Sequence, residues 1–311
     1  MTKDEILNML RSASAPISGE EMSRALGVSR AAVWKAVDQL RQEGYAIEAA
    51  TRRGYRLAAL PDRLDAAVIA GDTGADVHVY EEVTSTNTVA RQLAADGCPA
   101  GTCVLAERQT AGRGQRGHKW SSAEGLNLTF SLVLEPRFLP AGEQFLLNEA
   151  VALALTDTFA QFGIAARIKW TNDIYAGDKK LVGILIEHSY SGQTLARTIV
   201  GIGINVNQTE FDPALPNPVS MAMVAGRTFD RGEVLEAFRR HIGIRYAQLE
   251  LDERETLQRD YRERMYRLGE RHTFRYPDGT PTEASIEGVR PTGELLPTAR
   301  SGNICSRRSN S

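Results

Sequence analysis

The segment at residues 109–120 carries glycines and polar side chains that together could bind an anion. It reads Gln-Thr-Ala-Gly-Arg-Gly-Gln-Arg-Gly-His-Lys-Trp. Its glycines and arginines interleave as Gly112, Arg113, Gly114, Arg116 and Gly117. Glycine permits turns whose backbone N–H groups converge on a ligand, and arginine adds a fixed charge with forked donors. The segment therefore predicts a loop that holds a phosphate or a carboxylate, with Trp120 as an apolar wall beside it.

The spacing of these glycines separates the segment from the common phosphate-binding loops. A Walker A loop needs Gly-x-x-x-x-Gly-Lys-Ser/Thr, and residues 109–120 do not contain it. The glycines do fit Gly-x-Gly-x-x-Gly, but an isolated match to that pattern is a weak indication of dinucleotide binding. A solvated surface loop without a ligand is the alternative that this segment leaves open.

Two further segments place charged and amide residues within apolar runs. Residues 169–175 read Lys-Trp-Thr-Asn-Asp-Ile-Tyr and precede the run 179–187, Lys-Lys-Leu-Val-Gly-Ile-Leu-Ile-Glu. Residues 200–207 read Val-Gly-Ile-Gly-Ile-Asn-Val-Asn. An unpaired amide is costly inside a protein, so Asn205 is difficult to explain as a packing residue.

Together with Ser85-Thr86-Asn87, these segments resemble the biotin–protein ligases. The match is close to the bifunctional bacterial type, which is also the biotin operon repressor, and it runs from the N-terminus to about Leu296. Two positions depart from the pattern of that type. Thr171 stands where proline is usual, and Gln115 stands where many relatives carry arginine. The neutral amide of Gln115 removes a charge beside the adenylate, which could loosen retention of that intermediate.

The resemblance implies a two-step reaction. The biotin carboxylate attacks the α-phosphate of ATP, pyrophosphate leaves, and biotinyl-5′-AMP passes biotin to a lysine of a biotin-acceptor domain, the carrier protein of acetyl-CoA carboxylase. ATP and biotin are then substrates, and Mg²⁺ is the implied metal ion. Because two anions must approach each other, such a site needs cations, backbone donors and a metal ion.

The resemblance also assigns residues to biotin. Ser85, Thr86 and Gln109 would hydrogen-bond the ureido ring, since a buried polar ring without partners costs ~1–3 kcal/mol for each unmatched group. Trp120 would cover the ligand, and Gly183 would let the backbone close over the valeryl chain. The full set implied for biotin is Ser85, Thr86, Asn87, Gln109, Arg113, Gly114, Gln115, Trp120, Lys180 and Gly183.

The remaining implied residues serve the nucleotide and the chemical step. Arg113, Gly114 and Gln115 would lie along the biotin carboxylate and the adenylate phosphate, with Arg116 nearby, and Lys180 would reach the carboxylate and the α-phosphate. The implied catalytic residues are Lys180, Arg113, Arg116 and Asp173. The implied ATP-binding residues are Gly112, Lys169, Asn172 and Asn205, and the implied Mg²⁺ ligands are Asp173 and Asn205.

Three of these residues also have simpler explanations. Asp173 could be a turn residue after Asn172, Lys169 could be a solvated strand end, and Lys180 could be solvated like Lys179.

Residues 1–60 predict a helix-turn-helix followed by a β-wing. Ser18 begins a capping box, Gly27 ends that helix, and Ser29 can cap the next one, while residues 45–57 alternate as a wing. The side chains expected to face DNA are Arg30, Ala31, Trp34 and Lys35 on the second helix and Arg52 and Arg53 on the wing. A helical packing domain with scattered charges is the alternative.

The rest of the chain predicts a mixed α/β region and a small β module. Residues 126–134 alternate as a half-buried strand, 145–162 form a long helix, and 180–190 with 195–206 form a hairpin. Strands expected in 271–296 would need partners, and the polar tail beyond Leu296 contains no closing strand. The expected fold class is α+β, with a winged helix-turn-helix domain (1–60), a biotin/lipoate-ligase-like catalytic domain (64–264) and an SH3-like β module with an atypical tail (265–311). The resemblance supplies the SH3-like module, and the tail leaves its completeness open.

Composition limits the possible partners. The net charge is −2, so DNA binding must come from a local patch. No run approaches the ~20 apolar residues of a membrane span, and the first residues lack a signal-peptide core. The cysteines Cys98, Cys103 and Cys305 have no metal-binding spacing and fit a reducing cytoplasm. The expected partners are the biotin-acceptor domain of a carboxylase, operator DNA and a second copy of the chain when the adenylate is bound, without a membrane.

Two other functions remain open at this point. A lipoate-type protein ligase shares the implied catalytic fold, although the Ser85-Thr86-Asn87 motif and Gln109 favour a ureido ring over a dithiolane, which has no hydrogen-bonding edge. A non-enzymatic regulator that senses a ligand and binds DNA is the other alternative. Asp173, Lys180 and Asn205 argue against it, since sensing needs no metal or leaving-group chemistry.

Overall fold

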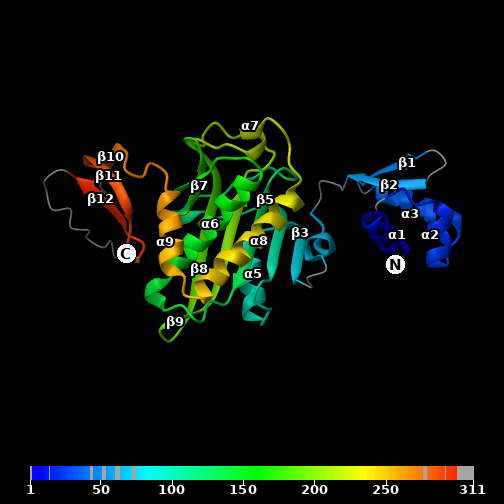
Figure 1. Cartoon of the computed structure of the whole chain (residues 1–311), viewed down its shortest axis with the longest axis horizontal. Helices are drawn as coiled ribbons and strands as arrows, with labels where there is room; N and C mark the ends of the chain where they lie inside the picture. Colours follow the sequence, from blue (N-terminus) through cyan, green and yellow to red (C-terminus); the bar gives the residue numbers. More distant parts are fainter. Residues whose placement is uncertain are drawn as a thin grey trace. The chain divides into compact units, whose positions relative to one another are not determined.

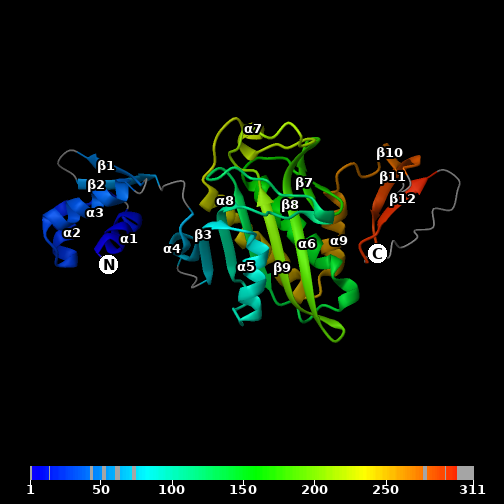
Figure 2. The same ribbon diagram turned by 180° about the vertical axis from the view of Figure 1, so that it is seen from behind.

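The computed structural model divides the chain into two compact units, Met1–Asp65 and Ala66–Ser311. Figure 1 and Figure 2 show the helices and strands of each unit from opposite sides. The described residues are 2–13, 15–42, 45–50, 54–59, 64–71, 75–275, 279–290 and 292–299. The predicted division of the second unit at residue 264 stays a prediction.

The first unit has the predicted helix-turn-helix and wing. Its elements are α1 (Thr2–Ser12), α2 (Gly19–Leu26), α3 (Arg30–Gln42), β1 (Ala46–Ala50) and β2 (Gly54–Ala59). The two strands pair antiparallel. Ile6, Met22 and Leu40 are fully buried and pack the three helices around one core.

Local signals begin and end the helices of this unit. The Ser18 hydroxyl accepts the backbone N–H of Glu21 at 3.1 Å, and the Ser29 hydroxyl accepts the N–H of Ala32 at 3.2 Å. Each bond satisfies a donor that the first helical turn cannot pair internally. Gly27 ends α2 at φ 65°, a conformation that glycine adopts without steric cost. These caps confirm the predicted starts of both helices and the end of α2.

The second unit is organised by a seven-stranded sheet in the order β3-β4-β5-β9-β8-β7-β6. The strands are β3 (Val77–Val83), β4 (Cys103–Gln109), β5 (Leu128–Leu134), β6 (Arg167–Lys169), β7 (Asp173–Ala176), β8 (Lys179–Ser191) and β9 (Thr194–Ile204). Only β3 and β4 among these pairs run parallel. The β8–β9 hairpin confirms the predicted one, with bounds that differ by one or two residues at each end.

Helices cover both faces of this sheet. They are α4 (Ala66–Ala70), α5 (Thr86–Ala95), α6 (Phe145–Gln161), α7 (Met221–Ala225), α8 (Arg231–Glu250) and α9 (Arg254–Glu263). The long helices α6, α8 and α9 lie on the face turned to the viewer in Figure 1, and α5 lies on the opposite face, seen in Figure 2. Phe130 of β5 packs on Phe238 of α8, with ring centroids 5.4 Å apart, and Val133 packs under Ala90 of α5.

The predicted half-buried strand at residues 126–134 is wrong in one respect. Every residue of β5 is buried, because α8 covers one face of the strand and α5 covers the other. Leu126 lies before the strand and is exposed. Alternation of apolar with smaller residues did not reveal the second covering layer.

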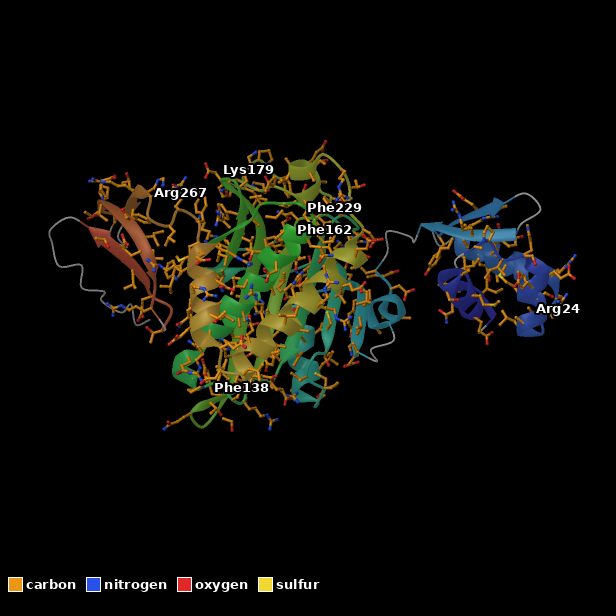
Figure 3. All side chains as sticks on the ribbon, in the orientation of Figure 1. Arg24, Phe138, Phe162, Lys179, Phe229 and Arg267 are labelled. Carbon is orange, nitrogen blue, oxygen red and sulfur yellow. The ribbon has the colours of Figure 1, made fainter. Side chains whose placement is uncertain are left out.

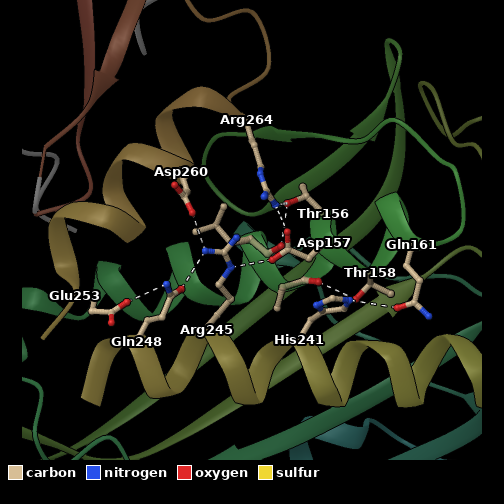
Figure 4. Close-up of polar contacts among 12 residues, drawn as sticks. Thr156, Asp157, Thr158, Gln161, His241, Arg245, Gln248, Glu253, Asp260 and Arg264 are labelled. Carbon is tan, nitrogen blue, oxygen red and sulfur yellow. Dashed lines mark hydrogen bonds and ion pairs between the residues drawn. The ribbon is translucent and has the colours of Figure 1, made fainter. Parts of the chain in front are cut away.

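Ion pairs and aromatic contacts join the helices on the α8 face. Arg245 of α8 contacts Asp157 of α6 and Asp260 of α9, each at 2.8 Å, and Arg264 donates to Asp157 as well (Figure 4). Burial raises the pKa of Asp157, but hydrogen bonds from the two arginines lower it more, so the net shift is downward. Figure 3 shows Phe162, after α6, beside Phe229, before α8; their ring centroids are 5.6 Å apart.

Strands β10 (Arg271–Arg275), β11 (Pro281–Val289) and β12 (Leu295–Ala299) form a three-stranded antiparallel sheet. The expectation that no closing strand continues beyond Leu296 is wrong, because β12 runs to Ala299 and pairs with β11, which also pairs with β10. The chain continues in β conformation through Pro297 to Ala299, since proline is tolerated on an edge strand. Cys305 and the rest of the tail from residue 300 lie outside the described residues.

Glu149 of α6 is a buried acid whose ionisation should reduce stability. Its side chain is 3% exposed, one carboxyl oxygen has no partner, and burial raises its pKa to about 8. Since the ordinary value is 4.5, the unfolded chain loses the proton at a lower pH than the folded chain. The contribution of the protonated Glu149 carboxyl to stability is therefore complete below the unfolded pKa of 4.5, and it declines as pH rises towards about 8.

We therefore expect Glu149→Gln, which cannot ionise, to remove this pH dependence. The melting temperature of the variant minus that of the parent protein should be larger at pH 8 than at pH 5. The increase should be at least ~3 °C, the scale of one kcal/mol in a domain of this size. Thermal unfolding followed by circular dichroism at both pH values measures the difference. Parallel pH profiles for the two proteins would contradict the ionisation of Glu149.

Candidate active site

A cavity of about 480 Å³ lies on the side of the sheet that carries the N-terminal end of α5. Its lining comes from the start of α5, the end of β4, the loop 113–120, and strands β5 to β9. The predicted site residues that line it are Ser85, Thr86, Asn87, Gln109, Arg113, Gly114, Gln115, Trp120, Lys169, Asn172, Asp173, Lys180 and Gly183. Segments separated by more than a hundred residues therefore meet at one cavity of ligand size.

Strand register builds the floor of the cavity. Asp173 of β7 is paired with Gly183 of β8, Gly183 with Gly203 of β9, and Gly203 with Thr129 of β5. These four residues form one row across the sheet, and all line the cavity. In the next row, Leu185 is paired with Gly201 and Gly201 with Ser131.

The two glycines of the first row make room for Trp120. A Cβ atom on Gly203 would lie 2.2 Å from the indole carbon Cε2, and one on Gly183 would lie 2.9 Å from Cζ3. The indole therefore lies directly on the strand backbones, as only glycine allows. Gly112 makes room for the backbone of the same residue, because a Cβ there would lie 2.5 Å from the Trp120 carbonyl oxygen. Gly112 is buried and is not part of the cavity lining.

Polar groups cluster where α5 begins. The Gln109 side-chain oxygen accepts the backbone N–H of Thr86 at 2.8 Å and lies 3.2 Å from the Thr86 hydroxyl. Ser131, fully buried in β5, lies 2.8 Å from that hydroxyl and 2.6 Å from the side-chain oxygen of Asn87. Hydrogen bonds thus hold Thr86 and Gln109, two of the three side chains expected to meet the ureido ring.

Positive charge dominates the rest of the lining. Arg113, Lys119, Lys169 and Lys180 are its basic side chains besides His118, and Asp173 is the single carboxylate among the described lining residues. Lys180 forms an ion pair with Asp173 at 2.7 Å. Lys169 donates to the Tyr175 hydroxyl at 2.8 Å, and Arg113 donates to Thr88 at 2.7 Å. This set of charges can neutralise two approaching anions.

Comparison with known proteins identifies the family. A model of the biotin/lipoate A/B protein ligase family matches residues 79–205, and a model described as HTH domain matches residues 2–56. The bifunctional ligase/repressor BirA of Bacillus spizizenii is 40% identical over 245 residues, covering 76% of this chain and 75% of that protein. The chain belongs to the biotin–protein ligase family.

Other members of the biotin–protein ligase family support this assignment. BirA of Escherichia coli is 32% identical over 243 residues, covering 77% of this chain and 74% of that protein. The solved structure of the Aquifex aeolicus ligase in complex with biotin and ATP has a TM-score of 0.62 and 28% identity, and covers 72% of this chain and 92% of that one. The resemblance and the α+β fold class are confirmed: the protein is a ligase with an N-terminal helix-turn-helix domain. A non-enzymatic regulator is therefore not supported.

Asn205, an expected ligand of nucleotide and metal, lies beside the cavity rather than in its lining. Its amide nitrogen donates to the carbonyl oxygen of Val219 at 3.1 Å. The loop that contains Asn217 and Val219 also pairs with the backbone of Lys180. The Lys180 N–H donates to Asn217 O at 2.7 Å, and Val219 N–H donates to Lys180 O at 3.0 Å. Asn205 and this loop therefore position the Lys180 backbone, and a direct role of Asn205 in a biotin–protein ligase site stays a prediction.

Two buried polar atoms of the lining have no hydrogen-bond partner: the indole N–H of Trp120 and the side-chain oxygen of Asn172. Asn172 is only 8% exposed, so water does not compensate its oxygen freely. The Trp120 N–H could pair with a hydrogen-bond acceptor and the Asn172 oxygen with an N–H or O–H donor, so a role of these two atoms in ligand binding stays a prediction.

Ten further residues line the cavity that were not predicted from the sequence as site residues. They are His118, Lys119, Thr129, Trp170, Thr171, Ile184, Leu185, Gly201, Ile202 and Gly203. The glycines had a detectable signal, because Gly201 and Gly203 alternate within an apolar strand and therefore share one face. Trp170 lies within the segment 169–175 that carries the resemblance, but its position depends on a distant contact, since its indole N–H donates at 2.9 Å to Gly293 O. The Trp170–Thr171 peptide bond is cis. The side chain of Arg116 lies outside the described part of the chain.

The candidate DNA-facing side chains lie at the surface of α3. Trp34 is 60% exposed, and Arg30, Ala31 and Lys35 are exposed as well. A tryptophan exposed to this extent is unusual on a surface with no partner. Arg52 and Arg53 lie outside the described residues. No helix in the described ranges has the length and apolarity that crossing a bilayer requires.

Proposed function

We propose that the protein condenses biotin with ATP to biotinyl-5′-AMP and transfers biotin to a lysine of a biotin-acceptor domain, as in acetyl-CoA carboxylase. One observation carries this proposal. A single cavity combines a hydrogen-bonded polar group at Thr86 and Gln109 with a cationic group around Lys180. Such a cavity suits a ligand with a neutral polar ring at one end and a carboxylate at the other.

In the first step, a biotin carboxylate oxygen attacks the α-phosphorus, and the bond to pyrophosphate breaks. No proton moves, so the protein needs no general base here. Lys180 and Arg113 reduce the repulsion between the carboxylate and the α-phosphate and stabilise the charge that develops on the phosphoryl oxygens. Trp120 excludes water from the mixed anhydride, which water would otherwise hydrolyse.

The polar side chains of Ser85, Thr86 and Gln109 favour biotin over lipoate as the substrate. A ureido ring offers two N–H donors and a carbonyl acceptor, which match Ser85, Thr86 and Gln109. A dithiolane offers these groups no hydrogen-bonding edge, and sites built for hydrogen bonds reject such analogues strongly. A lipoate-type ligase is therefore the less favoured assignment.

Mg²⁺ fits this site only together with nucleotide phosphates. Within the described residues, no group of three or more His, Cys, Asp or Glu side chains could hold a metal ion. Mg²⁺ is commonly bound by one or two carboxylates plus substrate phosphates, and Asp173 supplies one carboxylate. Mg²⁺ would lower the charge of the phosphates, and Lys180, the present partner of Asp173, would then turn to the α-phosphate. Asn172 would accept an N–H of the adenine amino group, and Lys169 would contact the nucleotide.

In the second step, the amine of the acceptor lysine attacks the biotinyl carbonyl carbon, AMP leaves, and the nitrogen loses a proton. The test uses labelled biotin, Mg·ATP and a purified biotin-acceptor domain. Label should enter the acceptor only when ATP is present, and acceptor whose target lysine is changed to arginine should stay unlabelled. Label on a lipoyl domain with lipoate, and none with biotin, would overturn the proposal.

We also propose that the first unit binds operator DNA and that the adenylate-bound form is a homodimer that represses transcription. Exposed Trp34, Arg30 and Lys35 on α3 support base contacts, because the second helix of such a unit enters the major groove. A wing carrying Arg52 and Arg53 would contact phosphates. Sedimentation with and without biotin and ATP tests the dimer.

Lys35→Ala should relax sequence preference among candidate operator fragments. The loss of a base contact costs ~1–3 kcal/mol on the preferred sequence and little on other sequences. Fluorescence anisotropy with operator and unrelated DNA at fixed salt measures both affinities. Arg137→Ala, an equal loss of charge at an exposed site of the other unit, is the matched control. Equal affinity ratios for Lys35→Ala and the parent protein would show that Lys35 reads no bases.

A further inference from the structure

A row of polar contacts leads from the Thr86–Gln109 pair to a carboxylate outside the cavity. Asn87 Nδ2 donates to Glu187 Oε2 at 2.7 Å, and Arg91 contacts the other Glu187 oxygen at 2.9 Å. On its other side, Asn87 Oδ1 lies 2.6 Å from the Ser131 hydroxyl, which lies 2.8 Å from that of Thr86. Glu187 does not line the cavity.

The sheet is built to hold Asn87 in this position. The side chain of Asn87 is 3% exposed and lies over Gly201, where a Cβ would come within 2.1 Å of its oxygen. Ser131 stands opposite Gly201 in the strand register and is fully buried. The contact with Asn87 explains why a serine, Ser131, lies inside the apolar strand Leu128–Leu134 and why a glycine, Gly201, lies beside it.

The carboxylate determines which way each hydrogen bond points. Only the amide nitrogen of Asn87 has hydrogens to offer Glu187, so its oxygen must face Ser131. That oxygen can only accept, so Ser131 donates its one proton there and has only lone pairs left for Thr86. The Thr86 hydroxyl then donates to Ser131 at 2.8 Å, which is within the usual O···O range of about 2.5–3.0 Å.

With its proton directed to Ser131, the Thr86 hydroxyl offers only lone pairs to the cavity. It lies 3.2 Å from the Gln109 side-chain oxygen, which the Thr86 N–H holds in place. The one proton of Thr86 can serve either Ser131 or the Gln109 oxygen, and the contact to Ser131 is the shorter, at 2.8 Å against 3.2 Å, so two acceptor oxygens lie side by side at Thr86 and Gln109 with no proton between them. They match an N–H donor of a ligand, which a ureido ring supplies and a carbonyl edge does not.

We propose that Glu187 is a positioning residue that sets the direction of this hydrogen-bond relay, through Asn87 and Ser131, and so makes Thr86 an acceptor for a ureido N–H. The inference rests on the proposed biotin ligase function. Without the carboxylate, Asn87 can turn its amide over and donate to Ser131. Ser131 would then donate to Thr86, and Thr86 would present its proton to the ligand N–H.

The test compares the parent protein, Glu187→Gln and Glu187→Ala in biotin-dependent, ATP-driven pyrophosphate release. Both variants should raise the KM for biotin roughly tenfold, which corresponds to ~1.4 kcal/mol, the scale of one net hydrogen bond. The kcat and the KM for ATP should change by less than about twofold, because a relay that ends at the ureido ring does not touch the reacting atoms. Glu82→Gln is the matched control, since Glu82 is also a strand glutamate paired with an arginine and lies outside the cavity lining.

A biotin analogue methylated on a ureido nitrogen separates positioning from loss of structure. The parent protein should prefer biotin to the analogue, and Glu187→Gln should lose most of that preference, because its Thr86 no longer accepts the N–H. An unchanged KM for biotin, or an unchanged preference, would overturn the relay. Absence of biotin-dependent pyrophosphate release in the parent protein would instead overturn the proposed function.

Discussion

Replacement of Lys180 by alanine should lower the rate of biotinyl-5′-AMP formation by ~10²-fold or more, the scale of losing one preorganised donor at a developing charge. Lys180 lies in the cavity lining and contacts Asp173, and backbone bonds to Asn217 and Val219 hold its main chain. Because the charge on the α-phosphate changes mainly in the transition state, kcat should fall more than the affinity for biotin. Pyrophosphate release and equilibrium biotin binding measure the two effects separately.

Lys179→Ala is the matched control for this experiment. Lys179 is the adjacent residue of β8, exposed and outside the cavity lining, and Figure 3 labels it. This variant should keep the parent rate. A pyrophosphate-release rate for Lys180→Ala close to that of Lys179→Ala would show that Lys180 has no role in adenylation.

Replacement of Gly203 by alanine should weaken biotin binding by more than tenfold. The new methyl group would lie 2.2–2.5 Å from three atoms of the Trp120 indole, so the ring must leave the strand surface. Close packing makes such an overlap expensive, commonly ~1–3 kcal/mol, and here the displaced ring forms part of the ligand cavity. Isothermal titration with biotin and thermal unfolding should be measured together, because overpacking lowers stability as well.

Gly243→Ala provides the comparison for a glycine that has free space around it. It lies within α8, and apart from its chain neighbours and the backbone of its own helix no atom comes within 4 Å of a Cβ built there. Alanine should therefore stabilise the helix by up to ~1 kcal/mol and leave biotin affinity unchanged. If Gly203→Ala binds biotin as tightly as Gly243→Ala does, Trp120 does not contribute to the ligand site as proposed.

Local sequence signals predicted the parts of this protein that depend on neighbouring residues. Ser18, Gly27 and Ser29 begin or end helices of the first unit through bonds that span a few residues. The glycine- and arginine-rich segment 109–120 contributes Arg113, Gly114 and Gln115 to the cavity lining, and its binding of an anion stays a prediction.

Resemblance to the biotin–protein ligases selected side chains that the sheet then brings together. Thirteen of the predicted site residues line one cavity. Gly112 and Asn205 do not, because each acts on a neighbour: Gly112 admits the Trp120 backbone, and Asn205 holds the loop at Val219. The residue types alone could not predict that Gly112 and Asn205 act on these neighbours.

The sequence by itself determined the family, the helix-turn-helix unit and the side chains available for adenylation, because these depend on motif content and short-range spacing. Only the tertiary structure decided the row from Asp173 to Thr129, the position of Trp120 over Gly183 and Gly203, and the contacts that connect Glu187 with Thr86. Strand register decides which residues meet, and each hydrogen bond depends on which partner has a proton to give. Both are set between segments up to a hundred residues apart, where sequence spacing carries no information about distance.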